Sequence, residues 1–179
     1  MTTSAMRIAT GTEAYRAGAA MLFLATMTIL AALGFEHIGS YVPCPLCLQQ
    51  RYAYYAGVPL LFTALVVLST EHKPWAALIF LAVGLFFLAN AGLGVYQAGA
   101  EWKFWPGPTT CATVQPITGS AGDLLKRLET TATVSCDEAS WRLAGLSFAG
   151  WNAVVSLLLC VGCHKAAFAA AAQDENITK

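Results

Sequence analysis

Four long stretches of this chain contain no Asp, Glu, Lys or Arg, and they decide what the chain can fold into. They cover residues 17–35, 52–70, 74–100 and 143–163 and hold 19, 19, 27 and 21 residues. A helix needs about 20 apolar residues to cross about 30 Å of hydrocarbon. Because lipid offers the backbone no hydrogen-bond partners, such segments cross as helices. The sequence therefore predicts an all-α membrane protein, a bundle of four transmembrane helices.

Composition supports the membrane class. Charged residues make up 11% of the chain, whereas a soluble domain carries about 25%. The net charge is zero, so we expect no nucleic-acid partner. One membrane domain, residues 1–179, is expected, with spans at about 17–36, 51–69, 75–97 and 144–164. Three spans follow the first, so we expect the first to remain uncleaved.

Four spans place two loops, about 37–50 and 98–143, on one face and both termini on the other. The two faces carry five Lys and Arg residues each, so the positive-inside rule does not settle the orientation by number. Arg7 and Arg16 precede the first span and favour a cytoplasmic N-terminus. Both termini are then cytoplasmic, and the two loops lie on the opposite face of the membrane.

The second loop is predicted to contain a short helix. Leu124, Leu125 and Leu128 share one helical face, with charged residues opposite. Such a pattern is typical of a helix lying in the membrane surface. The alternative is a solvated helix that packs on the loop itself.

Four cysteines lie on the loop face: Cys44, Cys47, Cys111 and Cys136. An even set indicates a disulfide framework if that face is oxidising. Four cysteines allow three pairings, and spacing favours Cys44 with Cys47 and Cys111 with Cys136. The second pair can instead be a structural staple of its loop. Alternatively, all four cysteines can bind zinc.

The surroundings of Cys47 indicate a reactive thiol. Pro43 and Pro45 cannot occupy a helix interior, so the second helix is predicted to begin near Cys47. The positive end of the helix dipole and Arg51, four residues on, both favour a thiolate there. Arg51 also has donors suited to an anionic oxygen. A thiolate and a guanidinium at the membrane surface can bind and reduce a quinone. The alternative for Arg51 is an interfacial residue that extends its charge to the surface.

A second cysteine pair matches the sequence pattern of a different kind of site. Cys160, Cys163 and His164 form the Cys-x-x-Cys-His pattern of covalent haem attachment. We expect this pair at the far end of the fourth span, on the opposite face from Cys44. Covalent haem and disulfide exchange both belong to the oxidising side, so packing cysteines are the favoured interpretation.

Taken together, the motifs resemble those of the DsbB family, bacterial inner-membrane proteins that reoxidise a periplasmic thiol oxidase. The resemblance spans nearly the whole chain, with four spans and two cysteine pairs. The matching residues are Pro43, Cys44, Cys47 and Arg51 in Pro-Cys-x-x-Cys-x-x-x-Arg, Trp105, Gly107, Pro108 and Cys111 in the second loop, and the stretch 136–147.

The resemblance implies an electron relay. A reduced DsbA-like partner would attack Cys111 of a Cys111–Cys136 disulfide, and Cys136 would pass the electrons to Cys44. Cys47 would be released as a thiolate that faces a membrane quinone, either ubiquinone or menaquinone, with Arg51 helping to hold it. The protein would then be a quinone-dependent, disulfide-forming oxidoreductase in the inner membrane.

One position departs from the family pattern. Relatives commonly carry a His shortly after the Tyr that ends the third span, whereas here Tyr96 is followed by Gln97 and Ala98. Gln97 can donate a hydrogen bond to a quinone, but it cannot carry a proton at neutral pH.

Three other readings remain open from the sequence. The chain can be a membrane protein that binds a metal or haem, or a structural tetraspan stapled by disulfides. It can also be related to the vitamin K epoxide reductase-like group. In that group the reactive Cys-x-x-Cys lies toward the last helices, which argues against this relationship.

Overall fold

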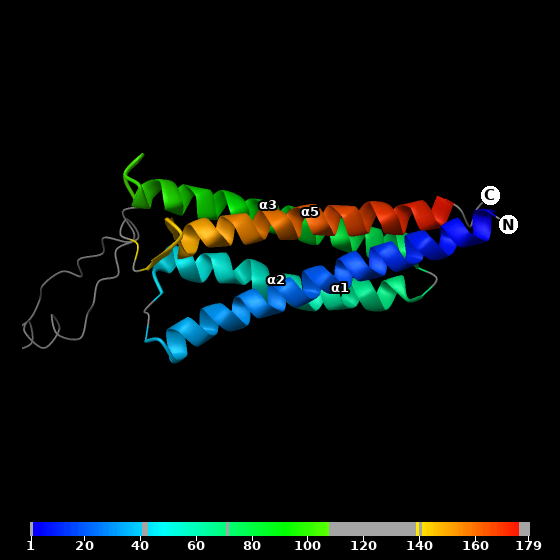
Figure 1. The fold of residues 1–179 in the computed structure, drawn as a ribbon, viewed down its shortest axis with the longest axis horizontal. Helices are drawn as coiled ribbons and strands as arrows, with labels where there is room; N and C mark the ends of the chain where they lie inside the picture. The colour runs from blue at the N-terminus through cyan, green and yellow to red at the C-terminus, as the bar shows by residue number, and fades with distance from the viewer. Residues whose placement is uncertain (1, 41–42, 71, 108–138, 140, 176–179) are drawn as a thin grey trace, which may run out of the picture.

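The computed structural model describes residues 2–40, 43–70, 72–107, 139 and 141–175, and no side chains for residues 2–11, 174 and 175. Four long helices lie alongside one another (Figure 1). They are α1 (Thr2–His37), α2 (Pro45–Leu68), α3 (Lys73–Glu101) and α5 (Phe148–Glu175). The predicted surface helix around residues 124–128 lies outside the described residues.

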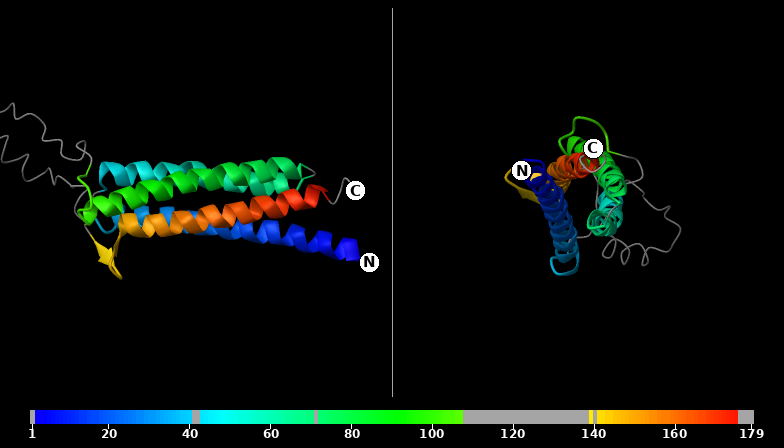
Figure 2. Two further views of the ribbon diagram at one scale, coloured as in Figure 1. Left: turned by 90° about the horizontal axis from the view of Figure 1, so that it is seen from above. Right: turned by 90° about the vertical axis from the view of Figure 1, so that its right-hand side faces the viewer.

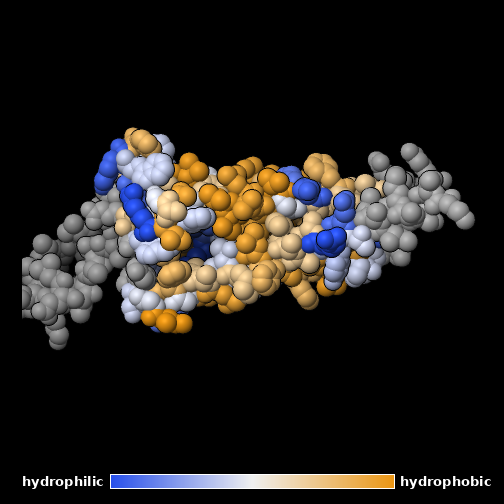
Figure 3. All heavy atoms as spheres, in the orientation of Figure 1, coloured by the Kyte–Doolittle hydropathy of each residue, from blue (hydrophilic) through white to orange (hydrophobic). Residues whose placement is uncertain are grey.

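Each helix contains a segment long and apolar enough to cross a membrane, which confirms the predicted four-helix membrane bundle. The segments are Thr12–His37, Pro45–Leu68, Lys73–Glu101 and Phe148–Gln173. Apolar side chains dominate the middle of the visible surface, and polar residues gather toward both ends (Figure 3). Large exposed side chains such as Phe23, Phe62 and Phe86 fit contact with lipid tails.

The start of α1 and the end of α5 lie at the same end of the bundle (Figure 1). We call the opposite end the loop end. It holds the α1–α2 connection, the end of α3 and a small hairpin of β1 (Arg142–Leu143) and β2 (Leu146–Ser147). Ala144 and Gly145 form the hairpin turn with φ of 51° and 84°, the left-handed geometry that suits a two-residue hairpin loop. The hairpin projects beside α5 (Figure 2).

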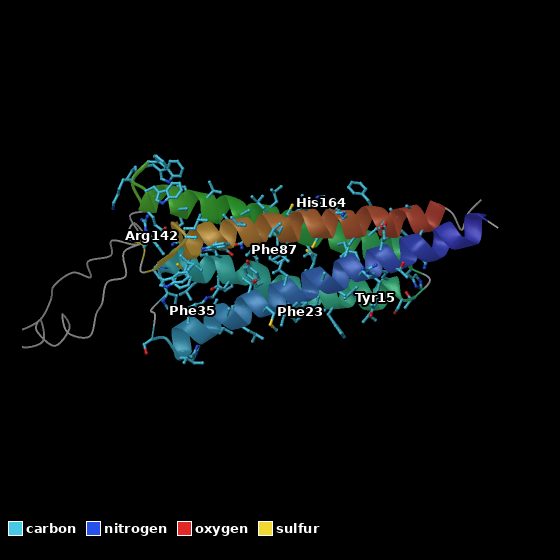
Figure 4. The ribbon with its side chains drawn as sticks, viewed as in Figure 1. Tyr15, Phe23, Phe35, Phe87, Arg142 and His164 are labelled. Carbon is cyan, nitrogen blue, oxygen red and sulfur yellow. The ribbon has the colours of Figure 1, made fainter. Side chains whose placement is uncertain are left out.

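Helices α3 and α5 approach one another closely where small residues face each other. A Cβ atom on Gly94 would lie 3.0 Å from the Ala149 carbonyl oxygen and 3.0 Å from the Ala153 Cβ. Small residues at such crossings bring helix backbones together and supply the van der Waals contact that holds membrane helices. Deeper in the bundle, Phe80 and Phe87 are fully buried (Figure 4 labels Phe87).

Buried polar side chains join three of the helices. Tyr54 of α2 donates to the Asn152 Oδ1 of α5 at 2.7 Å. Asn90 of α3 donates through Nδ2 to the Ser156 Oγ at 3.0 Å. In lipid an unpaired polar group is costly, so these bonds fix how α2, α3 and α5 face one another.

The sequence-based location of Cys160 and Cys163 is wrong. The alanine-rich run at 166–172 continues α5 to Glu175, so the two cysteines lie in the middle of the helix and not at its far end. Both are buried in the bundle core. The Cys160 Sγ lies 3.6 Å from the Nδ1 of His164, and Figure 4 shows His164 midway along the bundle.

Packing at Gly94 predicts an asymmetric effect of two alanine substitutions. Gly94→Ala forces α3 and α5 apart and should lower the free energy of unfolding by roughly 1–3 kcal/mol. Gly92→Ala is the matched control, because a Cβ there meets nothing within 4 Å. Unfolding in detergent, followed by circular dichroism, should show a lower midpoint for Gly94→Ala alone. Equal midpoints for the two variants would contradict the close crossing.

Candidate functional site

Cys44 and Cys47 lie at the start of α2, at the loop end. Cys44 is the N-cap of the helix, with φ −72° and ψ 161°, and Pro45 follows it within the first turn. The Cys47 backbone N–H donates to the Cys44 Sγ at 3.2 Å, and the two Sγ atoms lie 2.7 Å apart. The helix begins two residues earlier than predicted because proline is well suited to its first turn. The two sulfurs are therefore held within reach of disulfide exchange.

The two thiols differ in their surroundings. Cys44 is only 3% exposed, and the hydrogen bond that its S–H donates to the Cys47 sulfur, together with burial, raises the pKa of the Cys44 thiol well above its usual range. Cys47 is half-buried and faces the helix N-terminus, whose free N–H groups favour a negative charge. A proton that leaves the reduced pair therefore leaves Cys47, and Cys44 stays a thiol.

Gln97 of α3, one of the predicted site residues, contacts both sulfurs. Its Nε2 lies 3.3 Å from the Cys44 Sγ and 3.3 Å from the Cys47 Sγ. Its Oε1 accepts from the Gln50 Nε2 at 2.8 Å, and the Gln50 Oε1 accepts from the Asn152 Nδ2 at 2.6 Å. This chain of amides fixes the orientation of Gln97 so that its NH₂ group points at the cysteines.

Sequence reasoning missed Gln50 and Asn152. The available signal for Asn152 was its position as a polar amide within the apolar stretch 143–163, because a polar residue in a membrane helix usually marks an inward face. Gln50 lies three residues after Cys47, and Tyr54 lies seven residues after Cys47, so all three are on one side of α2.

Arg51 forms an ion pair with Glu36 at the end of α1, through Nη1 and Oε2. The Arg51 side chain is 12% exposed and that of Glu36 is 30% exposed. The structure thus gives Arg51 a carboxylate partner, where the sequence suggested only the thiolate or the membrane surface. Glu36 was missed, although it is the first charged residue after the first apolar stretch.

A cavity of about 500 Å³ opens beside the cysteine pair, within the size range of small-molecule sites. Phe35, Trp141 and Phe148 form an aromatic wall, with ring centroids 4.8–5.7 Å apart. Figure 4 shows Phe35 at the loop end. The polar and ionisable residues that line the cavity are Glu36, Cys44, Cys47, Gln50, Arg51, Tyr54, Gln97, Glu101, Ser147 and Asn152.

Four of the six predicted site residues therefore line this cavity together: Cys44, Cys47, Arg51 and Gln97. Glu36, which sequence reasoning missed, lines it as well. Cys111 and Cys136 lie outside the described residues, and so does their predicted pairing.

The unequal thiols predict an order of alkylation. In the fully reduced protein at pH 7, iodoacetamide should modify Cys47 at least about tenfold faster than Cys44, because the thiolate is the nucleophile and Cys44 is buried. Peptide mass spectrometry over a time course measures both rates, and buried Cys163 provides an unreactive internal reference. Faster labelling of Cys44 would contradict the assignment of the charge to Cys47.

Comparison with known proteins agrees with this arrangement. The family model described as "Disulfide bond formation protein DsbB" matches residues 15–165. A disulfide bond formation protein B of Marinobacter nauticus is 32% identical over 156 residues, which cover 79% of this chain and 86% of the relative. One of Aromatoleum aromaticum is 31% identical over 161 residues, covering 78% and 87%. No solved structure matches. The chain belongs to the DsbB family.

Proposed function

We propose that this protein forms disulfides by passing electrons from a periplasmic DsbA-like dithiol oxidase to a membrane quinone. Its family and its four spanning helices make it a multi-pass protein of the bacterial inner membrane and a disulfide-forming oxidoreductase. The observation that carries the finer proposal is the position of the Cys44–Cys47 pair in the wall of an apolar cavity between the helices. A thiol pair there can react with an oxidant that dissolves in lipid.

The cavity suits the head group of ubiquinone or menaquinone. Its aromatic wall offers flat faces to a planar ring, and Arg51 offers N–H donors to a ring oxygen. Cys47 and Arg51 line the cavity from the same face of α2. Bound quinone would supply a two-electron acceptor next to the sulfur that carries the negative charge.

The residues of the site have separate roles in disulfide formation. Gln97 holds both sulfurs through one nitrogen atom, and the helix N-terminus stabilises the Cys47 thiolate. As the electron pair leaves toward the quinone, the Cys44 sulfur bonds to the Cys47 sulfur. The pair then returns to the disulfide state, ready for the next dithiol.

The relay from the partner completes the cycle. In the proposed order a thiolate of the oxidase attacks Cys111, Cys136 then attacks Cys44, and the electrons reach Cys47. Each step is thiol–disulfide exchange. This order rests on the family resemblance, with both termini cytoplasmic and the loop end facing the periplasm.

A comparison of reduction potentials explains why a quinone is needed. A DsbA-type disulfide has a potential near −120 mV, whereas stable structural disulfides lie below about −300 mV. Oxidising the former with the latter alone runs uphill by roughly 180 mV, or about 8 kcal/mol for two electrons. A stronger terminal oxidant must drive the transfer.

The central test uses purified protein without oxygen. Wild-type protein, a reduced DsbA-like oxidase and a short-chain ubiquinone should consume quinone in step with thiol, as the quinone absorbance reports. Cys47→Ser should abolish consumption, because the electron pair then has no route from sulfur to quinone. Cys160→Ala, in the middle of α5, is the matched control and should retain activity. Quinone consumption that survives Cys47→Ser would exclude the mechanism.

Arg51 should contribute to quinone binding. Arg51→Met removes a charged donor of the kind that contributes about 1.5–3 kcal/mol per hydrogen bond. We expect a rise of roughly 10–100-fold in the KM for quinone and little change in the KM for the partner oxidase. Steady-state kinetics with each substrate varied in turn separate the two constants. An unchanged KM for quinone would assign Arg51 to its ion pair with Glu36 alone.

A further inference from the structure

Disulfide formation at Cys44 and Cys47 must move protons as well as electrons. Reduction of a quinone to a quinol takes up two electrons and two protons, and Cys44 begins the step as a thiol. Gln97, the residue that touches both sulfurs, has an amide side chain that cannot carry a proton at neutral pH. A different group in the site has to accept the proton of Cys44.

Glu101, the last residue of α3, is a carboxyl group placed beside this reaction. It is only 7% exposed and lines the same cavity as both cysteines. Its Oε1 lies 3.4 Å from the Nε2 of Gln97, and that nitrogen is the one that lies 3.3 Å from each sulfur. The carboxyl group and the two thiols therefore surround a single nitrogen atom, and the cavity that they all line has room for a water molecule that bridges them.

The second oxygen of Glu101 has an unusual environment. Oε2 is buried and, among the residues that the structure describes, has no hydrogen-bond partner. A buried polar atom of this kind is an exception that calls for a functional explanation. Within the same described ranges Glu101 also forms no ion pair, and the guanidinium of Arg51 lies instead on Glu36. Glu101 is therefore a cavity-lining carboxyl group with one oxygen whose hydrogen-bonding capacity is unused within the described part of the chain.

We propose that Glu101 accepts the proton of the Cys44 thiol and delivers it to the quinone oxygen. This inference rests on the proposed function. The Cys44 S–H bond breaks, its proton passes through a cavity water to Glu101, and the Cys44 sulfur bonds to the Cys47 sulfur. The electron pair of the Cys47 thiolate passes to the quinone. One proton reaches the quinone from Glu101 and one from water at the loop end, so the products are the disulfide and a quinol.

Other ionisable groups share the cavity with Glu101, and a pH profile must separate their effects from its own. Gln97 is its polar neighbour on α3. The ionisable groups that share its cavity from the other helices are Glu36 on α1 and Cys44, Cys47, Arg51 and Tyr54 on α2, while α5 and the hairpin contribute Asn152 and Ser147.

The test is a single turnover of the cysteine pair. Protein with Cys44 and Cys47 fully reduced is mixed with a short-chain ubiquinone in a stopped-flow instrument from pH 5 to 9, and quinone absorbance gives the rate. Glu101→Gln should slow the step by about 100-fold, the scale of general acid–base catalysis, and should change the shape of the pH–rate profile from that of wild type. Quinone affinity for the oxidised protein should change by less than about twofold.

Glu13→Gln, on the exposed side of α1 near the other end of the bundle, is the matched control and should behave as wild type. Glu101→Ala leaves space for a small acid, so added formate should restore part of its rate, and should leave wild type unchanged. If Glu101→Gln fails to fold, Glu101→Asp, which keeps the carboxyl group, should show a lower rate with the pH profile retained.

The outcomes separate this inference from the function on which it rests. Wild-type protein that consumes no quinone overturns the proposed function and the inference with it. An active wild type, together with a Glu101→Gln variant that matches it in rate and pH profile, overturns the role of Glu101 alone. Loss of quinone affinity or of thermal stability, with no formate rescue, also overturns it, because Glu101 would then serve only to position its neighbours.

Discussion

The structure depends on one constraint, the cost of an unpaired polar group inside a membrane bundle. Gln97, Gln50 and Asn152 satisfy one another in sequence, and Asn152 continues the chain to Tyr54. Because each amide finds its partner on another helix and lipid offers no alternative partner, each amide is held in a single orientation. Cys44 and Cys47 lie at the end of this series of hydrogen bonds, where Gln97 contacts both sulfurs. The precision of the sulfur environment at the loop end is thus supplied by residues deeper in the bundle, on three different helices.

The same constraint explains how the glutamine Gln97 holds the two sulfurs of the site. One role of such a residue is to hold the sulfurs, and Gln97 does this because Gln50 occupies its oxygen and leaves its NH₂ group for the thiols. A second role is to carry a proton, and an amide cannot do so. Glu101, one helical turn further on, brings a titratable group to the same nitrogen. Gln97 and Glu101 together thereby provide the two roles, contact with the sulfurs and proton transfer, that a single imidazole side chain can provide.

Much of the fold could be predicted from the sequence, because lipid leaves few alternatives to an apolar stretch of about 20 residues. The positions of Cys44 and Cys47 at a helix start followed from Pro43 and Pro45. The partners of the site could not be predicted in the same way. Gln50 meets Gln97 across 47 positions of the chain and Asn152 across 102, and no local pattern specifies which inward faces meet. The misplacement of Cys160 has a local cause, because charge was used to end the last span while alanine, a strong helix former, continued the helix.

Arg51 and Glu36 show how a charged site can exist at this depth. An isolated guanidinium beside an apolar cavity would carry a large desolvation cost, and a carboxylate partner reduces it. Glu36 occupies one terminal nitrogen, Nη1, whereas the guanidinium presents five N–H donors in a planar fork. Donors therefore remain for a ring oxygen without breaking the ion pair. In the proposed reaction, the negative charge that would develop on a quinone oxygen would meet donors already fixed in place, and preorganised donors of this kind lower a barrier without the cost of rearrangement.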